Sequence, residues 1–386
     1  MGCLGRVVRA GEALVGAGLA AGALGAWALA PRSEVWRKLQ GASGVPGRYF
    51  AHRGLHDFGS GIERDLSQAG QDERDYVALA RQLALGSNNN GRHGTSSEAV
   101  TQDWSATKAN SAFSSLSPEN SLPSFGAAAQ IGYGIELDVH LTKDGQVVVI
   151  HDDDFKRMAD DGRKVAEMTY EELSRIALGP LADADAHASQ SNPAKSELEQ
   201  TAGGPQTAES APSHGRHARH STEPEPIHAP LLTDVLKLVD GRVPLIVEYK
   251  MGSRLDRELM EKTDAILAAY TGQYVIESFN PLALAWYRYH RPGVCRGQLA
   301  APYHGKPRTG AEIVQALAGS LMLNWLGRPD FVAYEWHGGA SLPMRAFRAL
   351  GGISVAWTLR SREAEVKASD QFDYFIFESY LPPVAY

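Results

Sequence analysis

The sequence predicts an α/β protein built as a TIM (β/α)8 barrel, and three observations support this fold class. Eight short apolar or β-branched runs have the composition of buried strands. Helical patterns lie between most of these runs, which is the alternation of a parallel sheet. When two long polar stretches are set aside, the remaining chain is close to the roughly 250 residues typical of such a barrel.

Each expected strand is a run of four to eight residues in which large apolar or β-branched side chains predominate. The eight are Tyr49–His52, Gly134–Asp138, Val243–Lys250, Tyr274–Phe279, Val294–Leu299, Phe331–Trp336, Ile353–Leu359 and Tyr374–Glu378. Expected helices between them include Pro123–Ile131, Leu232–Leu238 and Arg254–Tyr270. Gly132 and Gly134 follow the first of these helices and predict its end, because glycine stops a helix readily.

Composition excludes several classes of protein. Of 386 residues, 38 are Lys or Arg and 45 are Asp or Glu, so the formal charge is −7. No basic excess is available to neutralise phosphates along a nucleic acid, and we therefore expect no nucleic-acid partner. The two cysteines, Cys3 and Cys295, exclude a disulfide scaffold and a cysteine-rich metal site.

Two polar stretches, at about 58–117 and 182–229, read as insertions into a barrel that spans 48–386. The first contains one expected amphipathic helix, Asp72–Leu85, with Tyr76 and Ala80 on its apolar face. The second has almost no large apolar residues and is expected to be disordered or a mobile flap. Its histidines, His214, His217 and His220, would suit a metal, but the low-complexity context favours a solvated segment.

The first 47 residues are expected to be a membrane anchor and linker. Residues Ala13 to Ala30 form an uncharged run that, as a helix, would span roughly 27 Å, close to the hydrocarbon core. Basic residues flank both ends, so the positive-inside rule does not orient the run. We therefore expect a single-pass protein of the cell membrane. The sequence does not indicate on which side of the membrane the barrel lies.

Two other interpretations of this run compete with the anchor. Ala28-Leu29-Ala30 would fit a signal-peptidase site, but Pro31 at the first mature position disfavours cleavage. A buried core helix is the third interpretation, and the uniform Ala/Gly/Leu composition leaves it no polar side for solvent.

Polar residues collect where three of the expected strands end. His52 and Arg53 end the first strand, Glu136 and Asp138 lie on the second, and Glu248 and Lys250 end the third. A barrel enzyme builds its active site at this face because all the strand ends converge there. Unrelated surface charges would explain one such cluster more easily than three.

The segment from Glu136 to His151 allows a prediction of register. Asp144-Gly145 is a strong signal for a two-residue hairpin turn, and in that register Asp138 would pair directly with His151. Opposed residues share a face, and Glu136 shares it by alternation, so these three side chains are expected to form one patch.

These residue types together indicate phosphoester chemistry. Carboxylates without cysteines suit a hard divalent cation, Mg²⁺ or Ca²⁺. Two histidines beside them can act as base and acid near neutral pH. A nearby arginine and lysine can hold an anionic oxygen, most naturally that of a phosphate.

At these residues the sequence resembles the glycerophosphodiester phosphodiesterase family, in particular a membrane-anchored bacterial branch. The motifs occur in the family's order: AHRG at Ala51–Gly54, PENS at Pro118–Ser121, ELDV at Glu136–Val139, the TKDG turn, HDDD at His151–Asp154, E-x-K at Glu248–Lys250, SFNP at Ser278–Pro281 and AWT at Ala356–Thr358. The resemblance extends over nearly all of the chain after Arg48, outside the two insertions. The resemblance implies a barrel of the phosphodiesterase type.

The resemblance also implies roles for individual residues. The implied metal ligands are Glu136, Asp138 and Glu248; the acid–base pair is His52 and His151; the phosphate contacts are Arg53 and Lys250, with Glu119 orienting Arg53 or joining that network; and Trp357 lines the substrate pocket. Asn120 reads equally well as a helix N-cap, Trp357 equally well as a buried barrel residue, and His56 as a loop residue.

The sequence departs from the family pattern at Arg360, where Asn is frequent, and at Glu378, where Asp is common. These departures, with the long first insertion, leave substrate choice open.

The expected function is metal-dependent hydrolysis of small glycerophosphodiesters to glycerol 3-phosphate and an alcohol. One alternative is a lysophospholipase-D-like or glycerophosphate-polymer-cleaving enzyme at the membrane. Another is an inactive barrel that binds glycerophosphates, which the intact histidines and carboxylates disfavour.

Overall fold

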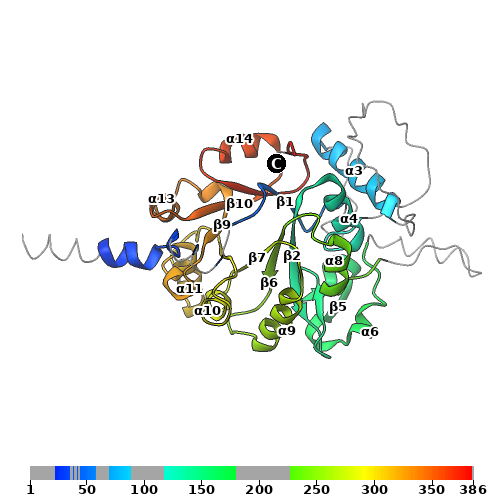
Figure 1. Ribbon diagram of the computed structural model, residues 1–386, viewed down its shortest axis with the longest axis horizontal. Coiled ribbons are helices and arrows are strands. Elements are labelled where there is room, and N and C mark those ends of the chain that lie inside the picture. Colours follow the sequence, from blue (N-terminus) through cyan, green and yellow to red (C-terminus); the bar gives the residue numbers. More distant parts are fainter. Residues whose placement is uncertain are drawn as a thin grey trace, which may run out of the picture.

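A closed parallel barrel forms the centre of the molecule (Figure 1). The computed structural model describes residues 22–34, 38, 41, 44–57, 69–87, 117–179 and 227–384. Eight parallel strands run in the order β1-β2-β6-β7-β8-β9-β10-β11, and β11 pairs with β1 to close the ring. The predicted TIM barrel is confirmed.

The strands lie close to the positions predicted for them. The barrel strands are β1 Tyr49–His52, β2 Gly134–Leu141, β6 Leu245–Tyr249, β7 Tyr274–Ser278, β8 Arg296–Ala300, β9 Phe331–Glu335, β10 Ile353–Leu359 and β11 Tyr374–Phe377. Three short strands lie outside the ring: β3 Val147–Val149 pairs antiparallel with β2, and β4 Asp154–Phe155 pairs with β5 Asp161–Lys164.

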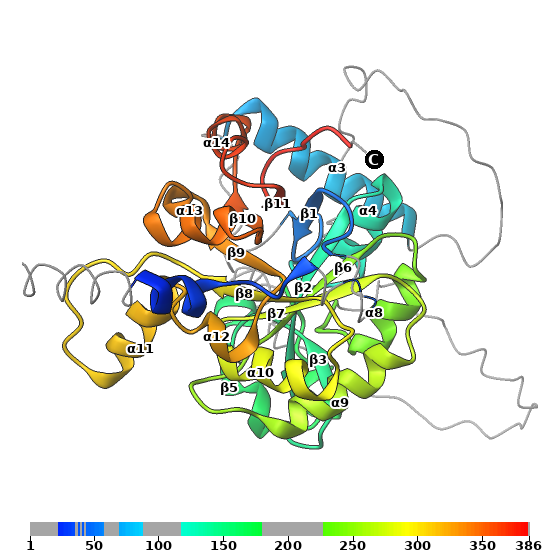
Figure 2. The same cartoon turned by 60° about the vertical axis from the view of Figure 1, so that its left-hand side comes forward.

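Helices surround the barrel in the two views of Figures 1 and 2. They are α3 Gln71–Ser87, α4 Leu122–Ile131, α5 Lys156–Ala159, α6 Tyr170–Leu173, α8 Leu232–Val239, α9 Arg257–Ala268, α10 Pro281–His290, α11 Gly310–Gly319, α12 Asn324–Gly327, α13 Leu342–Ala349 and α14 Arg362–Ala368. Helix α4 shows why the sequence sets these bounds. The Ser121 hydroxyl accepts from the backbone N–H of Ser124 at its start, and Gly132 ends it at φ 96°.

Alternate residues of each strand face opposite sides of the barrel wall. On β2, the buried Ile135 and Leu137 pack toward the helices, which leaves Glu136 and Asp138 facing the barrel interior. Aliphatic side chains together with the rings of Phe50 and Phe331 form a buried cluster inside the barrel, and glycines lie against the two rings. A Cβ on Gly134 would lie only 2.5 Å from the Phe50 ring, so only glycine fits there. The barrel interior next to the carboxylates is therefore filled by side chains.

The register predicted for the β2–β3 hairpin is wrong by one residue. Val139 pairs with Val149, and Ile150 donates its backbone N–H to Asp138 O at 3.0 Å, so Asp138 does not oppose His151. The loop has three residues because Thr142 N–H bonds to Gln146 O at 2.9 Å, and Gly145 adopts φ 75°. Three-residue hairpins commonly place such a left-handed residue at this position.

Part of the first predicted insertion packs into the core. Helix α3 contains the predicted amphipathic segment, and its Tyr76, Val77 and Ala80 are buried in the main hydrophobic cluster. Residues 58–68 and 88–116 of this insertion lie outside the described residues, as do 180–226, which include most of the second insertion and its three histidines.

The prediction of a single-pass membrane anchor is wrong. Among the helices of the described residues, none is both long enough and apolar enough to cross a bilayer. Of the predicted run, residues 22–29 are helical, a length of about 12 Å at 1.5 Å per residue; residues 13–21 lie outside the described residues. The end of this helix packs on the barrel, where Trp27 stacks on Trp325 at 6.0 Å between ring centroids.

Candidate active site

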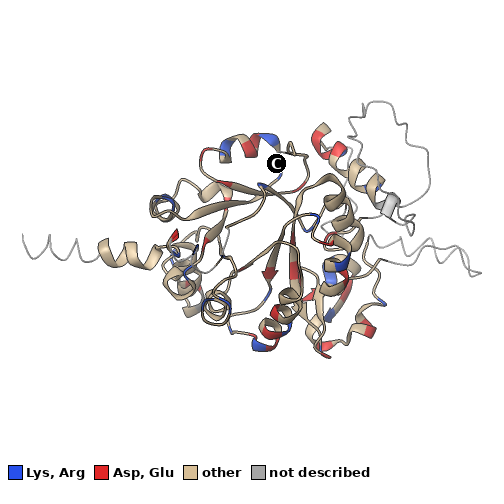
Figure 3. Ribbon diagram, viewed as in Figure 1, with Lys and Arg blue, Asp and Glu red and all other residues tan. Residues whose placement is uncertain are grey.

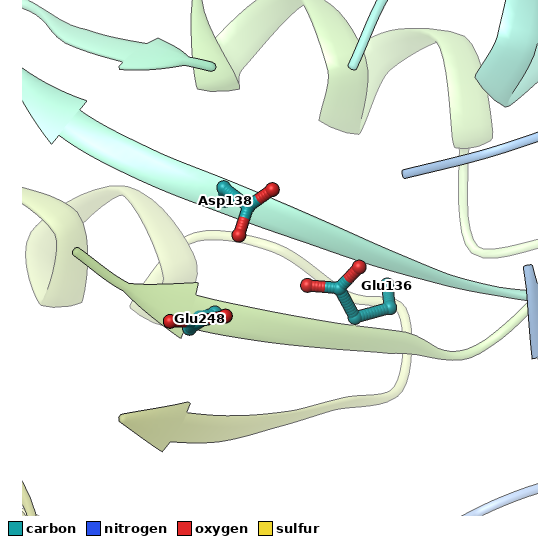
Figure 4. A group of neighbouring side chains, drawn as sticks. All are labelled: Glu136, Asp138 and Glu248. Carbon is teal, nitrogen blue, oxygen red and sulfur yellow. The ribbon is translucent and has the colours of Figure 1, made fainter. Parts of the chain in front are cut away.

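Three carboxylates from two neighbouring strands point toward one another in the barrel interior (Figure 4). Glu136 and Asp138 come from β2 and Glu248 from β6, and all three are buried. One oxygen of each lies within 4.8 Å of the others. Parallel pairing causes this convergence, because Asp138 is the register partner of Glu248. Acidic residues are visible on the central strands in Figure 3.

Two cationic side chains lie against these carboxylates. The Lys250 ammonium is 3.0 Å from Asp138 Oδ1 and 2.8 Å from Glu248 Oε1. The Arg53 guanidinium donates to Glu119 Oε1 at 2.7 Å, and its Nε lies 3.4 Å from Asp138 Oδ2. Glu119 therefore holds Arg53 at the edge of the carboxylate cluster.

Asn120 fixes the orientation of Asp138. Its amide Nδ2 donates to Asp138 Oδ2 at 2.7 Å, and Asp138 N–H donates back to Asn120 Oδ1 at 3.3 Å. Asn120 adopts φ 53°, a left-handed conformation that asparagine tolerates. The N-cap interpretation of Asn120 is wrong, because Ser121 occupies that position.

Burial makes negative charge costly in this cluster. Burial raises the pKa of Glu136 well above its usual range, and the charges of Asp138 and Glu248 act in the same direction. Burial also raises the pKa of Glu248, although Lys250 opposes the change. For Asp138, burial is outweighed by Lys250 and His151, which hold its pKa well below its usual range. Lys250 and Arg53 supply two positive charges beside the three carboxylates, and Arg53 is shared with Glu119, so ionisable acidic groups outnumber the cationic ones.

His52 forms a hydrogen bond with the carboxylate of Glu378, the residue that directly follows β11. Its Nδ1 lies 2.6 Å from Glu378 Oε2, and Arg360 donates to the other oxygen of Glu378. The buried His56 approaches the same carboxylate, with Nε2 at 3.6 Å from Oε2. Burial lowers the pKa of His52 to about 4, with Arg53 acting in the same direction. His52 is therefore neutral near pH 7.

His151 follows β3 and reaches the same cavity despite the shifted register. Its Nδ1 lies 2.6 Å from Asp152 Oδ1, and Arg157 Nε donates to Asp152 Oδ2 at 2.6 Å. Arg157 also donates to Glu119. This chain of contacts connects His151 to the residue that holds Arg53.

A small cavity of about 50 Å³ joins these groups. Its lining contains both histidines, both cationic residues, two of the three clustered carboxylates, one further glutamate and several apolar side chains. These residues are His52, Arg53, Glu136, His151, Glu248, Lys250, Glu277, Phe279, Leu299, Trp357 and Ile376. Trp357 packs edge-on against Phe279 at 5.7 Å, and Phe279 is 44% exposed. The structure thus brings the predicted histidines, cations and Trp357 to one cavity, with Asp138 and Glu119 in direct contact with its cationic residues.

The residues present fit a hard divalent cation. Carboxylate oxygens are the ligands that Mg²⁺ and Ca²⁺ prefer. A fourth acidic residue, Glu277, is paired in register with Glu248, and its Oε2 is buried with no hydrogen-bond partner in the described part of the chain. A cation would supply the positive charge that this group of carboxylates lacks.

Sequence patterns do not assign several residues of this site. They indicate no role at the site for His56, Asp152 or Arg157, and they mark Glu378 and Arg360 only as departures from the family pattern. Glu378 is the last residue of the final expected strand and directly follows the observed β11, and this place at a strand end is the available signal for its position at the site. Arg157 carries no such signal, because its contact with Glu119 depends on the fold of the β4–β5 region.

The structure is a TIM barrel with a buried group of three carboxylates beside two histidines at the carboxyl ends of its strands. A family model described as "Glycerophosphoryl diester phosphodiesterase family" matches residues 111–371. The chain belongs to that family. The match begins after the strand that supplies His52 and Arg53, so it covers the carboxylates and His151 but not these two residues.

Individual relatives match shorter parts of the chain. A glycerophosphodiester phosphodiesterase of Caldanaerobacter subterraneus is 44% identical over 63 residues, which is 16% of this chain and 26% of the relative. One from Bacillus altitudinis is 49% identical over 59 residues, 15% of this chain and 24% of the relative. The matched segments thus span about a quarter of the length of these curated relatives. An Oleispira antarctica phosphodiesterase, solved with the product sn-glycerol-3-phosphate, aligns at a TM-score of 0.47 and 19% identity, covering 68% of this chain and 87% of that one.

Proposed function

We propose that this protein hydrolyses small glycerophosphodiesters to glycerol 3-phosphate and an alcohol, and that it requires a divalent cation. The observation that carries the proposal is the buried group of Glu136, Asp138 and Glu248 beside two histidines, each with a carboxylate on its Nδ1. Family membership supports the same reaction.

The two histidines are suited to proton transfer. Because Glu378 and Asp152 hold the Nδ1 atoms, the Nε2 atoms are the positions from which protons would move. His52, whose pKa is low, accepts the proton of the nucleophile, which is water or the neighbouring glycerol hydroxyl. His151 then donates a proton to the oxygen of the leaving alcohol, a contribution of roughly 10²–10⁴-fold.

Arg53 and Lys250 would contact the phosphate of the substrate. Both line the cavity, and Glu119 fixes the direction of the Arg53 guanidinium. A Mg²⁺ or Ca²⁺ ion held by Glu136, Asp138 and Glu248 would neutralise a phosphate oxygen. As the phosphate enters, Lys250 exchanges part of its contact with the carboxylates for contact with the substrate.

The aromatic wall favours a second candidate substrate class. Phe279 is exposed and packs edge-on against the half-buried Trp357 at the cavity, and this apolar surface suits an acyl chain as well as a small head group. A lysophospholipase-D-like activity on lysophospholipids is therefore the second candidate function.

Phosphorus NMR of the purified full chain tests the proposal. Glycerophosphocholine, lysophosphatidylcholine and a glycerophosphate polymer are incubated with Mg²⁺ or Ca²⁺, and in parallel with a chelator. We expect glycerol 3-phosphate to appear from glycerophosphocholine only when the cation is present. Lysophosphatidic acid as the main product would favour the second candidate, and no product from any substrate would contradict both.

A further inference from the structure

A second and larger cavity, of about 500 Å³, lies away from the catalytic residues. Its lining includes four arginines, Arg32, Arg288, Arg296 and Arg328, and two aromatic residues, Trp27 and Tyr289. No acidic side chain lines it among the described residues.

This cavity lies at the opposite end of the barrel from the active site. Arg296 is the first residue of β8, whereas His52 is the last residue of β1. The starts and ends of parallel strands lie at opposite faces of a barrel. Figure 2 shows the helix of residues 22–29 beside α11 and α12, which places Trp27 at this end.

Arg296 is the central observation. The side chain is buried, with 1% of its surface exposed, and its Nη1 has no hydrogen-bond partner in the described part of the chain. Its Nε donates to Gly327 O at 2.7 Å, which fixes the guanidinium in place. A buried charged donor without a partner is costly, and because Arg296 lines the cavity, an anion held there would offset the buried positive charge.

The other three arginines differ in how their charge is compensated. Arg32 is paired with the buried carboxylate of Asp330, at 2.7 and 2.6 Å. Arg288 and Arg328 instead donate to backbone carbonyl oxygens. Burial lowers the pKa of Arg296 to about 10, and Arg32 and Arg288 act in the same direction, so the arginine remains charged near pH 7.

We propose that this cavity binds a soluble small molecule bearing a phosphate group, at a site separate from the catalytic centre. Several guanidiniums match a phosphate better than a single carboxylate, because the phosphate presents three oxygens and close to two negative charges. The cavity volume suits a small molecule. Trp27 and Tyr289 offer apolar surface for the remainder of the ligand, and Arg328 already lies over the Trp27 ring at 4.7 Å.

The proposal is tested by ¹⁹F NMR on the full chain labelled with 5-fluorotryptophan. The Trp27 resonance is assigned with Trp27→Phe and followed as inorganic phosphate is added, against sodium chloride at equal ionic strength. We expect a saturable shift with phosphate only. Because Arg296→Gln could prevent folding, the variant is Arg288→Gln with Arg328→Gln, and we expect its Kd for phosphate to rise at least ten-fold.

Arg257→Gln, at an exposed position on α9, is the matched control and is expected to leave the phosphate Kd within two-fold. An equal shift with chloride, or an unchanged Kd in the double variant, would overturn the proposal. A Trp27 response to phosphatidic acid vesicles but not to inorganic phosphate would also overturn it, in favour of a lipid surface. None of these outcomes depends on turnover, so the proposed hydrolysis is tested separately.

Discussion

Asp138 and His151 lie in one site, and we propose different tasks for them. Asp138 is one of the three carboxylates proposed to hold the cation, whereas His151, whose Nδ1 contacts Asp152, is proposed to protonate the leaving alcohol. We expect Asp138→Asn to raise the metal concentration needed for half-activation at least ten-fold. His151→Gln, the matched control, should lower turnover by roughly 10²–10⁴-fold and leave that metal concentration nearly unchanged.

A substrate with a better leaving group tests the role of His151 further. The p-nitrophenolate of a p-nitrophenyl diester departs without needing a proton, so the defect of His151→Gln should shrink on it. The measurement is the ratio of kcat/KM between wild type and variant on each substrate. Equal losses on both would rule out the leaving-group role, and equal weakening of metal activation in both variants would make His151 a ligand.

The protonation state of His52 provides an independent prediction. Burial and Arg53 lower its pKa to about 4, from a usual value near 6.5. A lowered pKa keeps the ring neutral as pH falls, so its ¹⁵N and ¹³C shifts should stay those of a neutral imidazole down to about pH 5. His52→Gln assigns the signals, and a titration midpoint near 6.5 would contradict this environment.

Among the elements, α3 shows that the first insertion contains structure on which the barrel depends. Tyr76 is fully buried, and its hydroxyl accepts from the backbone N–H of His56 at 3.2 Å. We expect Tyr76→Ala to lower the free energy of unfolding by about 3–5 kcal/mol, as for other large buried side chains. Leu342→Ala, at a residue 77% exposed, should change it by less than about 0.5 kcal/mol. Chemical denaturation of both variants measures the difference, and equal values would show that α3 does not support the core.

The second insertion leaves and re-enters the fold at neighbouring points. Leu178 N–H donates to Ile227 O at 2.7 Å, so the two ends are already adjacent. Replacing Asp183 to Glu225 by a short glycine-serine linker should therefore cost less than about 1–2 kcal/mol of stability. Turnover of a small diester should be nearly unchanged. A larger loss in a denaturation experiment would show that the deleted segment packs on the barrel.

Predictability from sequence differed between elements for physical reasons. The strands β1 and β10 were predicted at their observed bounds because apolar runs between turn residues specify buried strands well. The hairpin after β2 was misread by one residue, because the same Asp144-Gly145 pair fits both a two-residue and a three-residue loop. His151 nevertheless reaches the site because it follows the end of β3.

At the scale of the whole molecule, the convergence of the carboxylates could be predicted and much of their surroundings could not. Alternation along β2 places Glu136 and Asp138 on one face in any parallel barrel. The contacts of Glu378 with His52 and of Arg157 with Glu119 join residues far apart in the chain, and no local pattern encodes them. The membrane-anchor prediction rested on apolar composition alone, and composition does not set the length of a helix: in the described residues, the helical part of this run is 22–29.

We propose that the three buried carboxylates hold a divalent cation in the folded protein. Metal that binds only the folded state stabilises it, by about 2.7 kcal/mol at a hundred-fold excess over Kd. Glu136→Gln removes one ligand, but it also removes a group that burial and neighbouring charges disfavour in its ionised form. The substitution should therefore reduce the stabilisation that metal gives, and at the same time stabilise the metal-free protein. Measuring the variant with and without metal separates these two effects.

Thermal unfolding of the full chain, with chelator and then with excess Mg²⁺ or Ca²⁺, measures both effects directly. We expect the metal to raise the Tm of the wild type by several degrees and to leave that of Glu136→Gln nearly unchanged. In chelator, the variant should unfold at or above the wild-type Tm. An unchanged wild-type Tm on adding either metal, or an equal rise in the variant, would contradict the claim that these carboxylates form a metal site.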